Sequence, residues 1–353
     1  MKRLLVAAVT LSAVMITLGE ALHACSTFCI HLGGRQYFGR NYDFEIGDAM
    51  VMLNPVGLRK KGFQPGASTW TARFGSVTFN QFGRDNPMGG MNEAGLVVEL
   101  LWLDVTGYPS RDARSPLGVL EWIQYQLDTA ATVDEVLGSD KKVRIDGRVP
   151  LHYLVSDHTG RAATVEFLDG RLVAHVDEKL KVPVLTNSTY RESLEYLASR
   201  RGRMPGGSGS VERFARAAMK LSALKQSEPQ KPVDAIFGVL DDVAQPNTRW
   251  SIVYDQTKRV IYFRTDVHRR IRSVAMEALS FTCAEGARLL DIDTRIEGDV
   301  GKKFKDYSAA ANLAFITRIY AASSVTRNTP AGEVAAIAAH PDTATCNDSS
   351  GRW

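Results

Sequence analysis

The amino-acid sequence predicts a layered α+β fold. Strand patterns occur in pairs around short turns, and helical patterns lie between these pairs. Along the chain the order is strands, helices, strands, helices, strands. Short turns join neighbouring strands in antiparallel fashion, whereas parallel strands need a long crossover, usually a helix, between one strand and the next. The order therefore favours antiparallel sheets layered with helices over a doubly wound parallel sheet.

The start of the chain has the pattern of a secretory signal. Met1–Arg3 is positively charged, Leu4–Leu18 is apolar, and Gly19–Ala24 is rich in small residues. The apolar run is shorter than the about 20 residues of a membrane-spanning helix, and no later run reaches its length. We therefore expect residues 1–24 to be a signal peptide that is removed, and the protein to be exported, periplasmic or secreted, where disulfides persist.

The composition is that of an ordinary globular protein, with 44% hydrophobic and 23% charged residues. A formal net charge of +4, spread along the chain, is too small to indicate a nucleic-acid partner. The sequence has no HExxH or CxxC motif, no GxxxxGK[ST] loop and no GxSxG motif. We therefore expect no metal, no cofactor and, once the signal is lost, no stable membrane insertion.

Strand patterns begin directly after the expected cleavage point. Cys25–His31 alternates, Leu32–Gly34 interrupts the pattern and Gln36–Gly39 resumes it, which predicts a hairpin. The other predicted strands are Leu96–Leu103 after the turn Asn92–Gly95, three strands within 151–176, and two strands around Asp255–Lys258.

Helix signals lie between the strand pairs. Ser115 before Pro116 predicts an N-cap and a first-turn proline for a helix that runs to Leu127. Thr132 followed by Glu135 fits a capping box for a short helix. Apolar residues at helical spacing predict further helices over Val211–Ser222 and Pro232–Val243.

The character of the sequence changes after Ser280. We expect one domain over residues 25–280 and a mostly helical C-terminal extension, of unknown role, over residues 281–353. The extension starts with a charged, irregular stretch, and two alanine-rich helices are predicted over Ser308–Ser323 and Pro330–Ala339. Its two cysteines, Cys283 and Cys346, are candidates for a disulfide in an exported protein.

Cys25 has three possible roles: a lipid anchor, half of a disulfide, or a nucleophile. Removal of residues 1–24 would give Cys25 both a thiol and a free α-amine, whose ordinary pKa is about 7.7–8.0. Such an amine can accept the thiol proton at neutral pH, so no catalytic histidine is needed. His31, His152 and His158 are interpreted as structural or surface residues. Cys29 is expected to be a buried strand residue that is not bonded to Cys25, because both lie on one face of one strand.

The lipid-anchor interpretation rests on the segment Leu22-His23-Ala24-Cys25, which has the leucine and the small residue of a lipoprotein signal. Acylation of the α-amine would remove the proposed base. Histidine stands where such signals usually have a small residue, which favours the nucleophile.

Several motifs then follow in a fixed order: "YFGRNYDF", "GGMNEAGL", "PLHYLVSDHTG", "VLTNS" and "SVERFARAA". With Cys25 ahead of them, the sequence resembles the choloylglycine hydrolase and penicillin V acylase family of N-terminal-nucleophile hydrolases, from Cys25 to about Thr265. The resemblance implies a four-layer αββα sandwich with antiparallel sheets and Cys25 at the start of a central strand. It also implies a possible homo-oligomer, since tetramers are common in that family.

The resemblance assigns roles to five residues. Cys25 would be the nucleophile exposed by processing, Arg40 would lie near the thiolate, and Asp43 would bind the α-amine. Asn187 would serve the oxyanion hole, and Arg213 matches the arginine at the start of a later helix. These roles agree with elementary chemistry, because a cation lowers a thiol pKa and a carboxylate orients an amine.

Trp102 departs from the family pattern, which has an asparagine or a tyrosine at this position as a second oxyanion contact. An indole N–H donates and cannot accept, so Trp102 could serve only through its ring N–H or through a backbone N–H nearby. Trp70, Phe74 and Phe82 are candidates for an acyl pocket, although core packing explains them equally well.

The resemblance implies hydrolysis of a linear, non-peptide amide, such as penicillin V, an N-acyl-homoserine lactone or a bile-salt-like N-acyl amide. Two alternatives remain open: an acyltransferase with the same acyl-enzyme chemistry, and a lipid-anchored, non-catalytic envelope protein on the same fold. Cleavage after Ala21, with autocatalytic removal of Leu22 to Ala24, is an alternative route to a free Cys25.

Overall fold

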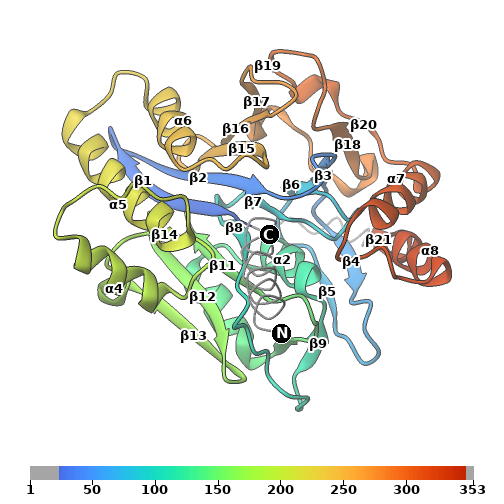
Figure 1. The fold of residues 1–353 in the computed structure, drawn as a ribbon. Coiled ribbons are helices and arrows are strands. Elements are labelled where there is room, and N and C mark those ends of the chain that lie inside the picture. The colour runs from blue at the N-terminus through green and yellow to red at the C-terminus, as the bar shows by residue number, and fades with distance from the viewer. Residues whose placement is uncertain (1–23, 347–353) are drawn as a thin grey trace, which may run out of the picture.

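The structure is a computed structural model that describes residues 24–346. The expected signal peptide therefore lies outside the described residues, except for Ala24. Two β-sheets form the centre of the molecule, and helices cover them on both sides (Figure 1). No helix among the described residues is long and apolar enough to cross a membrane.

The first sheet has seven strands, and the N-terminal hairpin lies near its middle. Neighbouring strands are antiparallel except for the last pair, which is parallel. In sheet order the strands are β14 (Val184–Leu185), β1 (Ser26–Leu32), β2 (Arg35–Asp43), β15 (Thr248–Asp255), β16 (Val260–Thr265), β17 (Arg272–Ala275) and β19 (Gly298–Asp299).

The second sheet has nine strands, all antiparallel to their neighbours. In sheet order they are β13 (Arg171–Val176), β12 (Ala162–Leu168), β11 (Leu151–Ser156), β8 (Val97–Trp102), β7 (Gly89–Asn92), β6 (Ser76–Asn80), β3 (Met50–Asn54), β18 (Arg288–Asp291) and β20 (Lys305–Asp306). The strands predicted from the pairs at 92–103, 151–176 and 255–258 are all present.

The two sheets pack face to face through apolar side chains, which form one continuous core. Phe79 of β6, for example, contacts Tyr254 and Phe263 of the other sheet edge-to-face. Helices α5 (Ser210–Ser227) and α6 (Pro232–Asp242) cover the seven-stranded sheet, and α4 (Tyr190–Arg200) packs on α5. Helix α2 (Val119–Thr129) packs on β7 and β8, with α3 (Val133–Gly138) after it. The architecture is thus the αββα sandwich that the resemblance implied (Figure 1).

One local prediction is wrong: Ser115–Leu117 is not the start of a helix. These residues form strand β9, which pairs in parallel with β10 (Val143–Ile145). The Ser115 hydroxyl accepts from Ser68 and caps no helix, and α2 begins only at Val119. Cap signals are local, whereas pairing with a strand more than 20 residues away depends on the tertiary fold.

The other helix predictions are confirmed. Thr132 accepts from the Glu135 backbone N–H at 3.3 Å, as the capping box requires, although the Glu135 carboxylate reaches back to Ala131. The sequence analysis did not anticipate α4, which has the same signal: Thr189 and Glu192 form a complete capping box.

The C-terminal stretch is more ordered than expected. The segment expected to be irregular contributes β18 and β20 to the nine-stranded sheet. The two predicted helices are present as α7 (Ala309–Ala322) and α8 (Ala331–Ala339). Strand β21 (Thr345–Cys346) then pairs with β4 (Leu58–Lys61), whose other neighbour is β5 (Thr69–Thr71). The hypothesised disulfide between Cys283 and Cys346 is formed. A domain boundary near residue 280 stays a prediction.

Candidate active site

Cys25 lies immediately before β1 and is almost completely buried, with 3% of its surface exposed. The β1–β2 register pairs Ser26 with Asn41. Continued by one residue, this register places Cys25 beside Tyr42, next to Asp43. The C-terminal end of β2 therefore lies next to Cys25, the expected nucleophile. Close packing fixes the register, because a Cβ at Gly39 would lie 2.6 Å from the ring of Phe28.

Arg40 is fully buried on the face of β2 that meets the other sheet. Its guanidinium donates to the backbone oxygens of Met88 at 2.9 Å and Leu100 at 3.3 Å. Burial raises the pKa of the Cys25 thiol, and the nearby Arg40 guanidinium partly offsets this effect. The structure thus brings a fixed cation close to the thiol.

Glu99 is a site residue that the sequence analysis missed. It is fully buried on β8, forms an ion pair with Arg40 and accepts a hydrogen bond from the hydroxyl of Tyr254. A Cβ at Gly89 would collide with its carboxylate, so the glycine makes room for the pair. The available signal was a single charged residue within the apolar strand sequence "VVELLW".

Asp43 ends β2 and is fully buried. One carboxylate oxygen accepts from the hydroxyl of Thr248, while Oδ2 has no hydrogen-bond partner among the described residues. Burial raises the pKa of Asp43 to about 7, although the Arg213 guanidinium, the Thr248 hydrogen bond and Arg40 lower it in part. The residue before Cys25 is still Ala24 in the described chain, so the Cys25 nitrogen is in a peptide bond.

Arg213, in the first turn of α5, connects the two segments that bear Cys25 and Asn187. Its Nη1 donates to the Cys25 backbone oxygen at 2.7 Å and to the Ser26 hydroxyl at 2.6 Å. Its Nη2 donates to Asn187 Oδ1 at 2.8 Å. Asn187 follows β14, and its Nδ2 donates to the Trp102 backbone oxygen at 3.0 Å. Hydrogen bonds to Oδ1 and from Nδ2 therefore set the orientation of the Asn187 side-chain amide. Nδ2 retains a second N–H.

Trp102 lies at the end of β8 beside these groups. Its indole N–H donates to Asp104 at 2.5 Å, so the ring nitrogen is occupied. The adjacent Leu103 N–H is also used, in a hydrogen bond to the Pro150 oxygen. The idea that the indole N–H holds an oxyanion therefore gains no support from this geometry. The ring instead lines the cleft next to Cys25.

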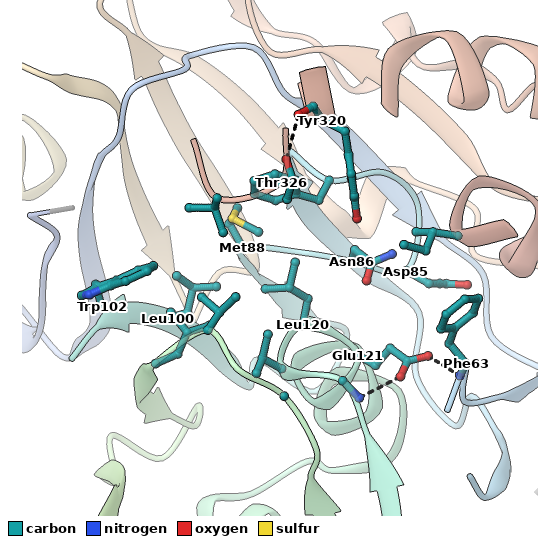
Figure 2. Close-up of a pocket in the computed structure, with 18 of the residues that line it drawn as sticks. Phe63, Asp85, Asn86, Met88, Leu100, Trp102, Leu120, Glu121, Tyr320 and Thr326 are labelled. Atoms are coloured by element: carbon teal, nitrogen blue, oxygen red, sulfur yellow. Dashed lines mark hydrogen bonds between the residues drawn. The ribbon is translucent and has the colours of Figure 1, made fainter. Parts of the chain in front are cut away.

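A cleft with a volume of about 290 Å³ opens at Cys25. Figure 2 shows Trp102 at one end and Phe63 and Glu121 at the other, with Leu100 and Met88 between them. The lining is predominantly apolar. Among the aromatic residues proposed for an acyl pocket, Phe82 lines this cleft, whereas Trp70 and Phe74 do not.

The remaining expectations concern metal binding and residues to which the sequence analysis gave no catalytic role. Cys29 is a free, buried strand residue, and burial raises the pKa of its thiol to about 12. His152 is fully buried and contacts the Thr186 backbone oxygen at 2.7 Å, so it supports the loop that carries Asn187. Within residues 24–346, no cluster of three or more His, Cys, Asp or Glu side chains is arranged to hold a metal ion.

Two packed sheets between helical layers, with a buried cysteine at the head of a central strand, define the sandwich of the N-terminal-nucleophile hydrolases. The structure of penicillin V acylase from Agrobacterium tumefaciens matches with a TM-score of 0.73 and 27% identity, over 80% of this chain and 98% of that chain. A mutant conjugated bile acid hydrolase from Clostridium perfringens matches with a TM-score of 0.67 and 18% identity, over 78% and 98% of the two chains. At that identity the second match supports the fold alone.

The sequence profile of the linear amide C-N hydrolases, choloylglycine hydrolase family, matches residues 25–202, just over half of the chain. The protein belongs to this family and is an amidohydrolase. Penicillin V acylase from Pectobacterium atrosepticum is 27% identical over 81% of this chain and 90% of its own length. Bile salt hydrolase/transferase from Lactiplantibacillus plantarum is 25% identical over 68% of this chain and 89% of its own length.

Proposed function

We propose that the protein is exported, that residues 1–24 are removed, and that Cys25 then hydrolyses a linear N-acyl amide by nucleophilic attack. The observation that carries this proposal is the arrangement around the Cys25 nitrogen. Asp43 interacts electrostatically with Cys25, and its buried Oδ2 has no hydrogen-bond partner among the described residues. A buried carboxylate oxygen of this kind requires a donor, and an N–H of a free α-amine at Cys25 would supply one.

The chemistry would proceed in two halves. The α-amine takes the proton of the Cys25 thiol, and the thiolate attacks the amide carbonyl carbon. The free N–H of Asn187 Nδ2 stabilises the oxyanion, with its amide held by Arg213 and by the Trp102 carbonyl. The ammonium returns the proton to the leaving nitrogen, the C–N bond breaks, and a thioester remains.

In the second half, water gives a proton to the amine and attacks the thioester carbonyl. The C–S bond breaks, the acyl group leaves as a carboxylic acid, and Cys25 regains its thiol. Because burial raises the pKa of this thiol, the resting site holds a neutral thiol that depends on the amine as base. Arg40 stabilises the thiolate when it forms, because its guanidinium interacts with the Cys25 thiol and is held in place by the Met88 and Leu100 backbone oxygens.

The apolar cleft supports an acyl group as the hydrophobic part of the substrate. Penicillin V, N-acyl-homoserine lactones and bile-salt-like conjugates all present such a group next to a linear amide. We favour the first two, because the penicillin V acylase of P. atrosepticum is similar over 81% of this chain and the bile salt hydrolase/transferase of L. plantarum over 68%.

The principal test combines N-terminal analysis with activity. Intact mass and N-terminal sequence of the exported protein, before and after iodoacetamide, should give a chain that begins at Cys25 and is alkylated there. Cys25→Ser should keep the fold and lose most hydrolysis of phenoxyacetyl, homoserine lactone and bile-salt amides. The matched control Cys29→Ser should keep the hydrolytic activity. A chain that begins upstream of Cys25, or that carries lipid on Cys25, would refute the mechanism and favour an anchored, inactive relative.

An acyltransferase is the second candidate, because one relative bears the name bile salt hydrolase/transferase. The thioester would then pass its acyl group to an amine instead of water. Product analysis in the presence of an amine acceptor distinguishes the two outcomes.

A further inference from the structure

A row of aromatic rings leads away from Cys25 along the cleft. The ring centroids of Tyr42 and Phe44 lie 5.6 Å apart, those of Phe44 and Phe82 6.3 Å, and those of Phe82 and Tyr320 5.8 Å. All four residues line the cleft. The row therefore begins beside the expected nucleophile and ends on helix α7, almost 300 residues later in the sequence.

Helix α7 belongs to the C-terminal arm, which we define as residues 309–346. The cleft is lined by Tyr320, Val325 and Thr326 from the end of α7 and the loop after it. Ile337 and His340, from the end of α8, line it as well. Figure 2 shows Tyr320 extending into the cleft opposite Leu120, beyond Met88. The arm thus forms one wall of the site.

The arm is fastened to the segment that carries the expected catalytic groups. Glu45, two residues after Asp43, accepts from the Ser323 hydroxyl at 2.9 Å and from the Ser324 backbone N–H. Arg318 of α7 pairs with Asp48 at 2.6 Å. At the other end, the disulfide and the β21–β4 pairing hold the arm to the rest of the molecule.

We propose that the C-terminal arm sets the acyl-chain length that the site accepts, with Tyr320 contacting the far end of the chain. This inference rests on the proposed function, because it takes the cleft to be the acyl pocket. An unbranched acyl chain bound through its carbonyl at Cys25 would lie along Tyr42, Phe44 and Phe82. Each methylene buried there contributes about fourfold in affinity until the chain meets the arm.

The test measures binding of saturated fatty acids, which are the products of such a reaction. Acids of two to fourteen carbons are titrated calorimetrically into the processed Cys25→Ser protein, alone and with a second change at Tyr320. With Tyr320 intact, affinity should rise with chain length to a plateau. Tyr320→Ala should lower affinity about tenfold for chains that reach the ring and leave shorter chains unchanged. Tyr320→Trp should move the plateau to shorter chains.

Leu313→Ala is the matched control, because Leu313 lies on the same helix, is 42% exposed and does not line the cleft. It should leave the whole series unchanged. The inference is overturned if Tyr320→Ala acts equally at all chain lengths or at none, or if Leu313→Ala reproduces its effect. Should Tyr320→Ala fail to fold, the direction of the plateau shift in Tyr320→Trp decides.

The same series separates the two proposals. If Cys25→Ser binds acids with a plateau set by Tyr320 while the Cys25 enzyme cleaves no acyl amide, the arm inference stands and the proposed function fails. If amides are cleaved but residue 320 does not affect chain length, only the arm inference fails.

Discussion

Arg213 donates to Asn187 Oδ1 at 2.8 Å while the other arm of its guanidinium donates to the Cys25 backbone oxygen at 2.7 Å. One side chain therefore fixes the distance between the expected nucleophile and the expected oxyanion donor. Only a forked donor can satisfy both acceptors in fixed directions, and an ammonium cannot. Arg213 is 2% exposed, so water cannot readily replace either bond.

Arg213→Lys should therefore lower kcat by about a hundredfold, the typical cost of losing one oriented oxyanion donor, with a smaller effect on KM. The measurement is steady-state hydrolysis of an acyl amide. Arg216→Lys is the control. Arg216 lies three residues further along α5, and its guanidinium donates to the exposed backbone oxygens of Asp242 and Gly207. Equal losses in the two variants would contradict the bridging role.

Asp43 should make the unprocessed chain less stable as the pH rises. Its pKa is about 7 in the folded chain, against about 3.9 for an exposed aspartate. Between these values the folded state holds a proton that the unfolded state has released, so stability falls as pH increases from about 4 to 7. The two pKa values differ by about three, which corresponds to roughly 4 kcal/mol of folding stability, most of it lost by pH 8.

The measurement is the free energy of unfolding in urea at pH 5 and at pH 8. It uses unprocessed Cys25→Ala protein, in which residue 25 is still bonded to Ala24. Adding Asp43→Asn should remove most of the pH dependence. In the mature chain, a hydrogen bond from a free α-amine at Cys25 would lower the pKa of Asp43, and the same dependence should be weaker. If the Asp43→Asn chain responds to pH as its parent does, the carboxylate is not the cause.

The sequence anticipated the part of the site that lies on one hairpin. Cys25, Arg40 and Asp43 come together because a short turn joins two adjacent strands, which is a local relationship. Glu99 reaches Arg40 only because the two sheets pack face to face, and nothing in the spacing of the two residues indicates this. The position of Tyr320 in the cleft depends on how helix α7 packs, which is a contact over a still longer distance in the sequence. The same limit explains the wrong helix start at Ser115, where pairing of β9 with β10 decided the outcome.

Glu99→Gln should shift the reactivity of Cys25 to lower pH. The Glu99 carboxylate offsets part of the Arg40 charge, so its removal leaves the guanidinium more positive towards the thiolate. The pKa of the Cys25 thiol should then fall. The measurement is the rate of iodoacetamide labelling of Cys25 from pH 5 to pH 9, read by mass spectrometry.

Glu166→Gln is the matched control, because Glu166 is equally buried but accepts from the Tyr190 backbone N–H, away from Arg40. Both changes should destabilise the fold, since each leaves buried polar partners incompletely satisfied. Only the change at Glu99 should move the labelling profile. If both variants label like the parent at every pH, Glu99 contributes to packing and not to the thiol.

The Cys283–Cys346 disulfide closes a loop over a sequence separation of 63 residues and holds the end of the C-terminal arm. In the chain-entropy account, a loop of this length gives about 4 kcal/mol, which is an upper figure for a real protein. Cys283→Ser with Cys346→Ser should therefore unfold at lower urea than the parent, and the parent in the presence of a phosphine reductant should match the double variant. In limited proteolysis of the folded proteins, residues 309–346 should be cut earlier in the double variant than in the parent. Without the disulfide, the arm is held by its hydrogen bonds and packing alone. Identical urea midpoints for variant and oxidised parent would show that the remaining contacts, such as Arg318 with Asp48, suffice without the covalent link.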